Sequence, residues 1–167
     1  MRVTLLDVSP PVWRRLRVPS PVPLNVLHSI LQVAMGWEDR HLYEWLIGEE
    51  YYDSDDDASM VLGDVAPPDS VLHYTYDMGD GWEHLVEVLS VVPYDGSVAP
   101  VAVLDGARAA PPEDSGGSSG YAALLGALAN PSDLDHEDAV AWVGDSLDPD
   151  YFDPAAINRR LEAFWRV

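Results

Sequence analysis

Histidines and paired acids are the residues of this chain that could do chemistry. His73, Asp77 and His84 lie close together in the sequence, and Glu113 and Asp114 form an adjacent acidic pair. Imidazole nitrogens and carboxylate oxygens are ligands for divalent transition metals, and an open coordination position would let a bound water act as a nucleophile near neutral pH. One hypothesis is therefore a metal-assisted hydrolase that uses these five residues.

The absence of two residue types narrows the chemistry. The sequence of 167 residues has no cysteine, which excludes disulfides, thiolate metal sites and cysteine nucleophiles. It has no lysine either, which excludes a P-loop lysine and Schiff-base catalysis. A reaction would have to use Asp, Glu, His, Ser, Tyr, Arg or a metal, and the sequence leaves open whether the protein is an enzyme.

The charge of the chain is strongly acidic and unevenly distributed. The net charge is −20, made up of +3 over residues 1–37 and −23 over the remainder. So acidic a body repels phosphate backbones and argues against nucleic-acid binding, except at Arg14, Arg15 and Arg17. Two interpretations stay open: the acid excess confers solubility, or the surface mimics a nucleic acid and binds a basic protein.

No part of the sequence has the composition of a membrane span or a signal peptide. Uninterrupted apolar runs stay below the roughly 18 residues that a transmembrane helix needs. Prolines and charged residues interrupt residues 1–17. We therefore expect a cytoplasmic protein with no membrane association.

Strands are predicted mostly before helices along the chain. Alternating apolar residues predict strands at 2–8, 12–18, 41–47 and near 101–104, and a hairpin at 71–92. Apolar spacing predicts helices at 24–34, where Gly36 ends the helix, and at 121–129, 135–143 and 154–165. This order predicts a single α+β domain over residues 1–167, with an antiparallel or mixed sheet built around the central hairpin and helices packed on one side.

The register of the hairpin decides which side chains share a face. Gly79-Asp80 is typical of a two-residue turn, which would pair Asp77 with Trp82 and place His73 and His84 on the same face as Asp77. The competing interpretation is structural. In that case Asp77 bonds backbone amides of the turn, Trp82 packs in the core, and His84 is an ordinary core or surface histidine.

Longer motifs follow one another along the chain. They are Pro11-Val12-Trp13-Arg14-Arg15, Leu27-His28 through Met35-Gly36-Trp37, His41-Leu42, the hairpin motif Tyr76-Asp77-Met78-Gly79-Asp80-Gly81-Trp82-Glu83-His84, Pro111-Pro112-Glu113-Asp114-Ser115-Gly116-Gly117 with Gly120-Tyr121, and Asp148-Pro149 with Phe152-Asp153. In order and spacing they resemble the plasmid pRiA4b ORF-3-like family, whose relatives include passenger proteins of insertion sequences. The resemblance runs from about Val3 to the last helix. It implies an α+β fold and an association with mobile elements, but no particular reaction.

Two positions around the acidic pair depart from the family pattern. Members commonly carry cysteines on either side of the Pro-Pro-Glu-Asp motif, where this chain has Ala110 and Ser115. If those cysteines hold a metal or a disulfide in relatives, this chain has lost that feature. The acidic pair Glu113-Asp114 is kept.

The residues and the resemblance together lead to a functional hypothesis. We expect a mobile-element-associated, non-catalytic protein that recognises a protein partner or ligand in a groove between the 77–84 turn and the 111–121 loop. The rim of that groove would consist of Tyr76, Asp77, Asp80, Trp82, His84, Glu113, Asp114 and Tyr121. The metal-assisted hydrolase, with a divalent metal as its cofactor, and the acidic nucleic-acid mimic are the alternatives.

Overall fold

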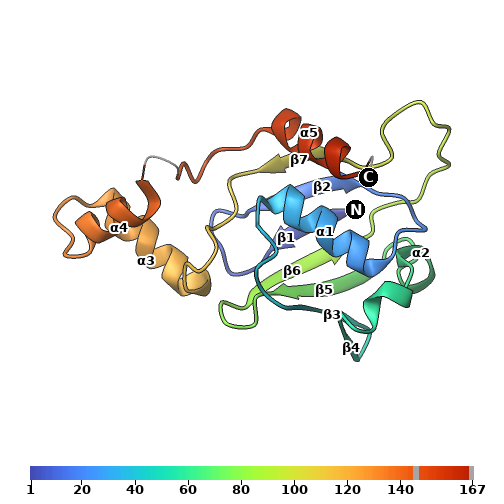
Figure 1. Cartoon of the computed structure of the whole chain (residues 1–167), viewed down its shortest axis with the longest axis horizontal. Coiled ribbons are helices and arrows are strands. Elements are labelled where there is room, and N and C mark those ends of the chain that lie inside the picture. Colours follow the sequence, from blue (N-terminus) through green and yellow to red (C-terminus); the bar gives the residue numbers. More distant parts are fainter. Residues whose placement is uncertain (145–146, 166–167) are drawn as a thin grey trace.

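A single antiparallel sheet forms the centre of the fold. In the computed structural model, which describes residues 1–144 and 147–165, seven strands pair antiparallel in the order β4-β3-β5-β6-β1-β2-β7 (Figure 1). The strands are β1 (Arg2–Leu5), β2 (Trp13–Arg17), β3 (Tyr43–Ile47), β4 (Glu50–Asp53), β5 (Val71–Tyr76), β6 (Trp82–Glu87) and β7 (Ala102–Ala107). The predicted α+β class is confirmed. Residues 145–146 and 166–167 of the predicted domain lie outside the described residues.

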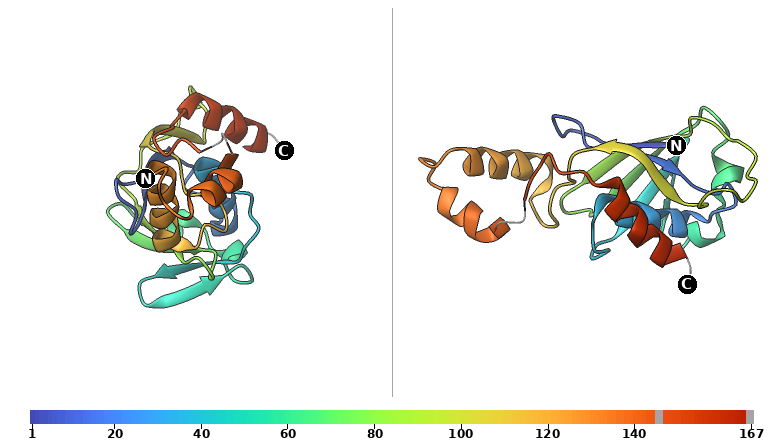
Figure 2. Two further views of the ribbon diagram at one scale, coloured as in Figure 1. Left: turned by 90° about the vertical axis from the view of Figure 1, so that its left-hand side faces the viewer. Right: turned by 90° about the horizontal axis from the view of Figure 1, so that it is seen from above.

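The helices fall into two groups in space. Helices α1 (Leu24–Met35) and α5 (Pro154–Trp165) lie on one face of the sheet, as predicted, whereas α3 (Gly117–Ala129) and α4 (His136–Val143) lie beside each other beyond the strand ends (Figures 1 and 2). A short α2 (Leu62–Val65) follows a 3-10 turn at Asp57–Ser59. Within the described ranges, none of the helices has the length and apolar composition of a membrane span.

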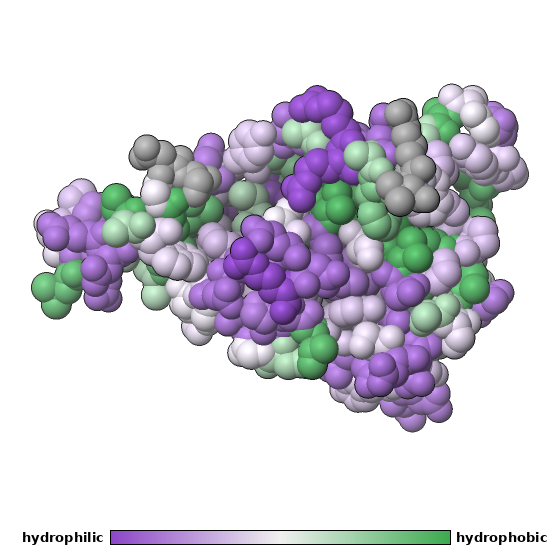
Figure 3. Space-filling model, viewed as in Figure 1, coloured by the Kyte–Doolittle hydropathy of each residue, from purple (hydrophilic) through white to green (hydrophobic). Residues whose placement is uncertain are grey.

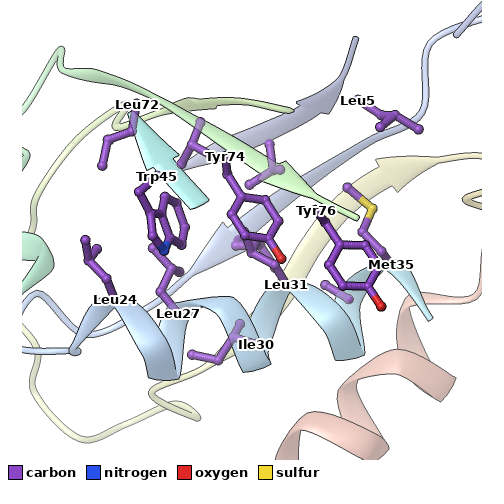
Figure 4. Close-up of a cluster of buried hydrophobic side chains, with 14 of the residues drawn as sticks. Leu5, Leu24, Leu27, Ile30, Leu31, Met35, Trp45, Leu72, Tyr74 and Tyr76 are labelled. Carbon is purple, nitrogen blue, oxygen red and sulfur yellow. The ribbon is translucent and has the colours of Figure 1, made fainter. Parts of the chain in front are cut away.

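Helix α1 buries its apolar face on the central strands. Leu24, Leu27, Ile30 and Leu31 are buried, at the spacing that brings them to one side of a helix, and Figure 4 shows them facing side chains from the sheet. Gly36 ends the helix in the left-handed region, with φ 90°, and its N–H donates to the Gln32 carbonyl at 2.8 Å. The chain then turns at Trp37 and leads directly into the candidate site.

The predicted register of the β5–β6 hairpin is wrong by one residue. The structure pairs Tyr76 with Trp82 and Tyr74 with His84, so the turn spans residues 77–81. The reason is Asp77, which takes φ 59° and accepts the Gly79 N–H on its Oδ1 at 2.9 Å, starting the turn earlier than a Gly79-Asp80 turn would.

The corrected register places the side chains of β6 on the other face relative to those of β5, so His73 and His84 no longer share a face. Tyr74, Tyr76, Trp82 and His84 are buried beneath α1, while His73 is exposed on the opposite face of the sheet. His73 and His84 therefore cannot bind one ion.

Two further elements differ from the expectations. The aromatic and then acidic sequence of residues 51–57 is typical of a loop, yet these residues include most of edge strand β4, in which Tyr52 pairs with Trp45 of β3. Helix α3 begins at Gly117, four residues before the predicted start at Tyr121, because Gly116 and Gly117 take positive φ values of 83° and 69° on entering the helix.

Candidate metal centre

Three segments that are far apart in the sequence meet at one end of the sheet. They are the connection between α1 and β3, the β5–β6 turn at 77–81, and the segment that precedes α3. The Gly116 N–H donates to Asp80 Oδ2 at 3.0 Å, which joins the turn to the third segment. The indole Nε1–H of Trp37 donates to the Pro111 carbonyl at 2.9 Å and joins the first segment to the third.

The contact between the turn and α3 depends on a glycine. A Cβ on Gly117 would overlap the backbone oxygen of Asp80, and Gly117 takes φ 69°. Any residue other than glycine would be strained at this position, both by the close approach of Asp80 and by the backbone conformation. The start of α3 is thereby held against the turn that carries Asp77.

His41 lies at the point where these segments meet. Its Nε2 is 3.1 Å from Asp114 Oδ1, 3.5 Å from Asp77 Oδ2 and 3.5 Å from Glu113 Oε2. Among the residues that the structure describes, this buried Nε2 atom has no hydrogen-bond partner. A ring nitrogen that is close to three carboxylates, yet hydrogen-bonded to none of them, is oriented toward the space between them.

The spacing of these atoms suits a bound metal ion. Two ligand atoms that bind one ion at about 2.1 Å lie about 3.0 Å apart in an octahedron and about 3.4 Å apart in a tetrahedron. The 3.1 and 3.5 Å separations around His41 match these values. The ligand atoms of His41, Asp77 and Asp114 all lie within 4.8 Å of one another.

Asp77 uses its two carboxylate oxygens for different purposes. Oδ1 accepts the backbone N–H of Gly79 at 2.9 Å and that of Asp80 at 3.3 Å, so it fixes the turn. Oδ2 instead faces His41. Because the Asp77 side chain is only 9% exposed, its charge requires a compensating positive partner.

Glu113 is held in place by hydrogen bonds from Glu38 and Tyr76. Its Oε1 accepts the backbone N–H of Glu38 at 2.7 Å, and both oxygens lie 3.1 Å from the Tyr76 hydroxyl, which can donate to either. Burial, together with the nearby Glu113 carboxylate, raises the pKa of Tyr76 to about 12. Tyr76 therefore remains a neutral hydrogen-bond donor at physiological pH and fixes the position of Glu113.

Some of the predicted site residues lie at this centre or support it, and the others do not. Asp77, Glu113 and Asp114 face His41, and Asp80 ties the turn to the segment before α3. His73 lies on the other face of the sheet, and the remaining predicted residues are buried and cannot form an exposed rim: Tyr76, Trp82, His84 and Tyr121.

His84 is a core histidine close to the centre. Its Nδ1 lies 3.1 Å from the Tyr74 carbonyl, and its ring packs edge-on against Trp37 with centroids 5.3 Å apart. Burial lowers the pKa of His84 to about 4, so the ring is neutral at physiological pH. This placement agrees with the structural interpretation of the hairpin.

His41 is the residue of the centre that is missing from the predicted set. It follows the Gly36-Trp37 turn without belonging to a helix or strand, so periodicity gives it no role. The signal that could have found it is the His41-Leu42 motif, which stands among the motifs of the family resemblance.

The predicted basic cluster is also divided by the fold. Arg14 is 2% exposed and donates hydrogen bonds to the carbonyls of Ala34, Trp13, Ala107 and Arg108, so it cannot contact a nucleic acid. Arg15 and Arg17 remain outside the core, on the opposite face of β2.

Comparison with known proteins places the chain in a family. The model for the plasmid pRiA4b ORF-3-like protein matches residues 1–156. The chain belongs to this family. Among pRiA4b ORF-3-like relatives, the uncharacterised protein y4hQ from Sinorhizobium fredii is 40% identical, in an alignment that covers 95% of this chain and 84% of y4hQ.

The fold of this pRiA4b ORF-3-like protein is also similar to a solved structure. The crystal structure of MM3350, a protein of unknown function from Methanosarcina mazei Go1, matches with a TM-score of 0.86 and 33% identity, over 93% of this chain and 94% of the other.

Proposed function

We propose that this pRiA4b ORF-3-like protein binds a divalent transition-metal ion through His41, Asp77 and Asp114 and supports metal-assisted hydrolysis. The observation that carries the proposal is the His41 Nε2 atom, which lies within 3.5 Å of three carboxylates without a hydrogen bond to a described residue. A cation between these four side chains would compensate the buried charge of Asp77.

The mixture of ligand atoms indicates which metals fit. One imidazole nitrogen with carboxylate oxygens suits Zn²⁺ or Mn²⁺, whereas copper(I) and iron–sulfur clusters favour sulfur ligands, and the chain has no cysteine. Three protein ligands leave coordination positions for water.

A bound ion would supply an acidified water and a Lewis acid. Glu113 is the residue placed to accept a proton from such a water, because Tyr76 and the Glu38 N–H fix it beside the ligand atoms without occupying every lone pair. Asp114, whose side chain is 59% exposed, opens the centre to solvent and to a substrate.

The non-catalytic recognition hypothesis is less well supported by this geometry. The aromatic residues of its proposed rim are buried in the core, and the exposed side chains that remain, such as Asp114, are acidic. A partner at this position would therefore have to be cationic, and a metal ion is the smallest cation that fits. From the resemblance alone, we also infer association with mobile elements.

Titration calorimetry with Zn²⁺ and Mn²⁺ on tag-free, chelator-treated protein tests the proposed binding. We expect one ion per chain, and we expect His41→Gln and Asp114→Asn each to weaken its affinity by about tenfold or more. His73→Gln is the matched control, because His73 is an exposed histidine on the other face of the sheet. Equal affinities in wild type and His41→Gln would contradict the proposal.

The catalytic part requires a separate assay. Hydrolysis of activated phosphate and carboxylic esters should depend on added metal, and Glu113→Gln should lower the rate by about 100-fold while metal still binds. Metal binding without any metal-dependent hydrolysis across these esters would contradict the catalytic part and leave a binding site.

A further inference from the structure

A second candidate site lies at the opposite end of the sheet from His41. Strands β6 and β7 are joined there by a long loop, residues 88–101, that arches away from the sheet (Figure 1). A cavity of about 770 Å³ lies between this loop, the end of β2 with the residues that follow it, and α2. This volume is within the range of small-molecule sites.

The wall of this cavity is unusually apolar for exposed surface. Large hydrophobic side chains that are each at least 45% exposed line it: Leu89, Val91, Val92, Tyr94, Val98 and Leu104. Figure 3 shows hydrophobic residues at this end of the molecule. Apolar surface concentrated in one hollow is typical of a binding site rather than of scattered surface residues.

The loop that carries most of these side chains has few hydrogen bonds to the rest of the protein. From residue 89 to 100, the described hydrogen bonds are a contact from Arg17 to the Ala99 carbonyl and two within the loop, at Tyr94 and Ser97. The loop can therefore adapt its apolar side chains to a ligand without breaking a strand ladder.

Positive charge borders the same cavity. Arg15 and Arg17 belong to its lining together with one carboxylate, that of Asp95, and neither arginine has a carboxylate within 4.0 Å in the part of the chain that the structure describes. In a protein of net charge −20, arginines without an acidic partner beside an apolar hollow are complementary to an anion that carries an apolar chain.

We propose that this cavity binds a soluble anionic amphiphile, a single-chain carboxylic acid of the fatty-acid type. Its alkyl chain would lie under the 88–101 loop, and its carboxylate would accept hydrogen bonds from Arg15 and Arg17. Arg15 is exposed and free to form a forked contact, whereas Arg17 keeps its bond to Ala99 with one nitrogen and has others to donate. The site is independent of the proposed metal centre.

Titration calorimetry with decanoate, below the concentration at which it forms micelles, tests the proposal. We expect saturable binding of one decanoate per chain, with affinity rising up to about fourfold for each methylene added from hexanoate to decanoate. Arg15→Gln should weaken binding by about five- to tenfold, and Val91→Asp by about tenfold or more.

Matched controls lie outside the lining of the cavity. Arg159→Gln removes an exposed arginine from α5, and Val140→Asp adds an acid to a valine of α4 that is 44% exposed. Both should bind decanoate like the wild type. In backbone amide NMR spectra of the wild type, decanoate should shift resonances of the 88–101 loop and leave those around His41 unchanged. This measurement uses the wild type alone, so it does not depend on whether a variant folds.

Several results would overturn the proposal. They are an absence of saturable decanoate binding, equal binding by wild type and Val91→Asp, equal affinity for decylammonium, and shifts confined to α3 and α4. Binding to anionic phospholipid vesicles without binding to monomeric decanoate would also overturn it, because the site would then recognise a membrane surface.

Discussion

The pH dependence of stability should show that His84 is a neutral core histidine. Burial lowers the pKa of His84 to about 4 in the folded protein, whereas in the unfolded chain it is about 6.5. Above pH 6.5 the ring is neutral in both states and has no effect on stability. As pH falls from 6.5 to 4, the unfolded state gains a proton that the folded state does not, so the free energy of unfolding decreases.

The expected magnitude follows from the difference between the two pKa values. A difference of about 2.5 units, at 1.36 kcal/mol per unit, gives a loss of about 3 kcal/mol on going from pH 6.5 to 4. His84→Gln removes the titrating group. Over the same pH range, the free energy of unfolding of this variant should therefore fall by about 3 kcal/mol less than that of the wild type. At pH 7 the variant starts from a lower stability than the wild type. Other groups that titrate, such as the buried His28, cancel in the comparison.

Urea denaturation at pH 7, 6, 5 and 4.5 measures these differences. His73→Gln is the control, because it changes an exposed histidine on the other face of the sheet, outside the core. The reasoning would be refuted if His84→Gln lost stability with the same pH slope as the wild type, since His84 would then titrate alike in both states.

Three further substitutions test the local structure around the candidate centre. Gly117→Ala should destabilise the protein by about 2 kcal/mol or more in urea denaturation, because φ is 69° and the new Cβ would overlap Asp80, and it should weaken metal binding. Gly126→Ala in α3 meets nothing within 4 Å and should instead stabilise by about 0.5–1 kcal/mol; a loss there would contradict the described helix. Arg14→Met should cost about 3 kcal/mol by calorimetric unfolding, because it leaves several buried carbonyls without donors, and a neutral effect would contradict its structural role.

The elements with a strong period were predictable from the sequence. Helix α1 follows from the spacing of Leu24, Leu27, Ile30 and Leu31 and from Gly36 at its end, and the structure places it at residues 24–35. Edge strand β4 was not predictable, because its four residues are mostly exposed and the acidic residues that follow them resemble a loop.

The register of the hairpin shows why the candidate site was only partly predictable. A single side-chain hydrogen bond from the Gly79 N–H to Asp77 shifts the start of the turn, and that one-residue shift places His73 and His84 on opposite faces of the sheet. The sequence contains the residue that causes the shift. The two possible turns, however, differ in free energy by only about the contribution of one hydrogen bond, which sequence patterns do not resolve.

The acidic half of the centre was easier to predict than its histidine. The pair Glu113-Asp114 stands out beside two prolines and several glycines. His41 reaches the pair only because Gly36 redirects the chain after α1 and the Trp37 indole bonds to the Pro111 carbonyl. Tertiary contacts of this kind produce no periodic pattern in the sequence.

Nitrogen-15 NMR of the histidine side chains during a Zn²⁺ titration tests the central claim most directly. Coordination changes the resonance of the nitrogen that binds the ion, and the five histidines of the chain can be followed separately. We predict that Nε2 of His41 responds in proportion to one bound ion and that the resonances of His73 and His84 stay unchanged. Saturation with Zn²⁺ while His41 Nε2 stays unchanged would contradict the proposed centre.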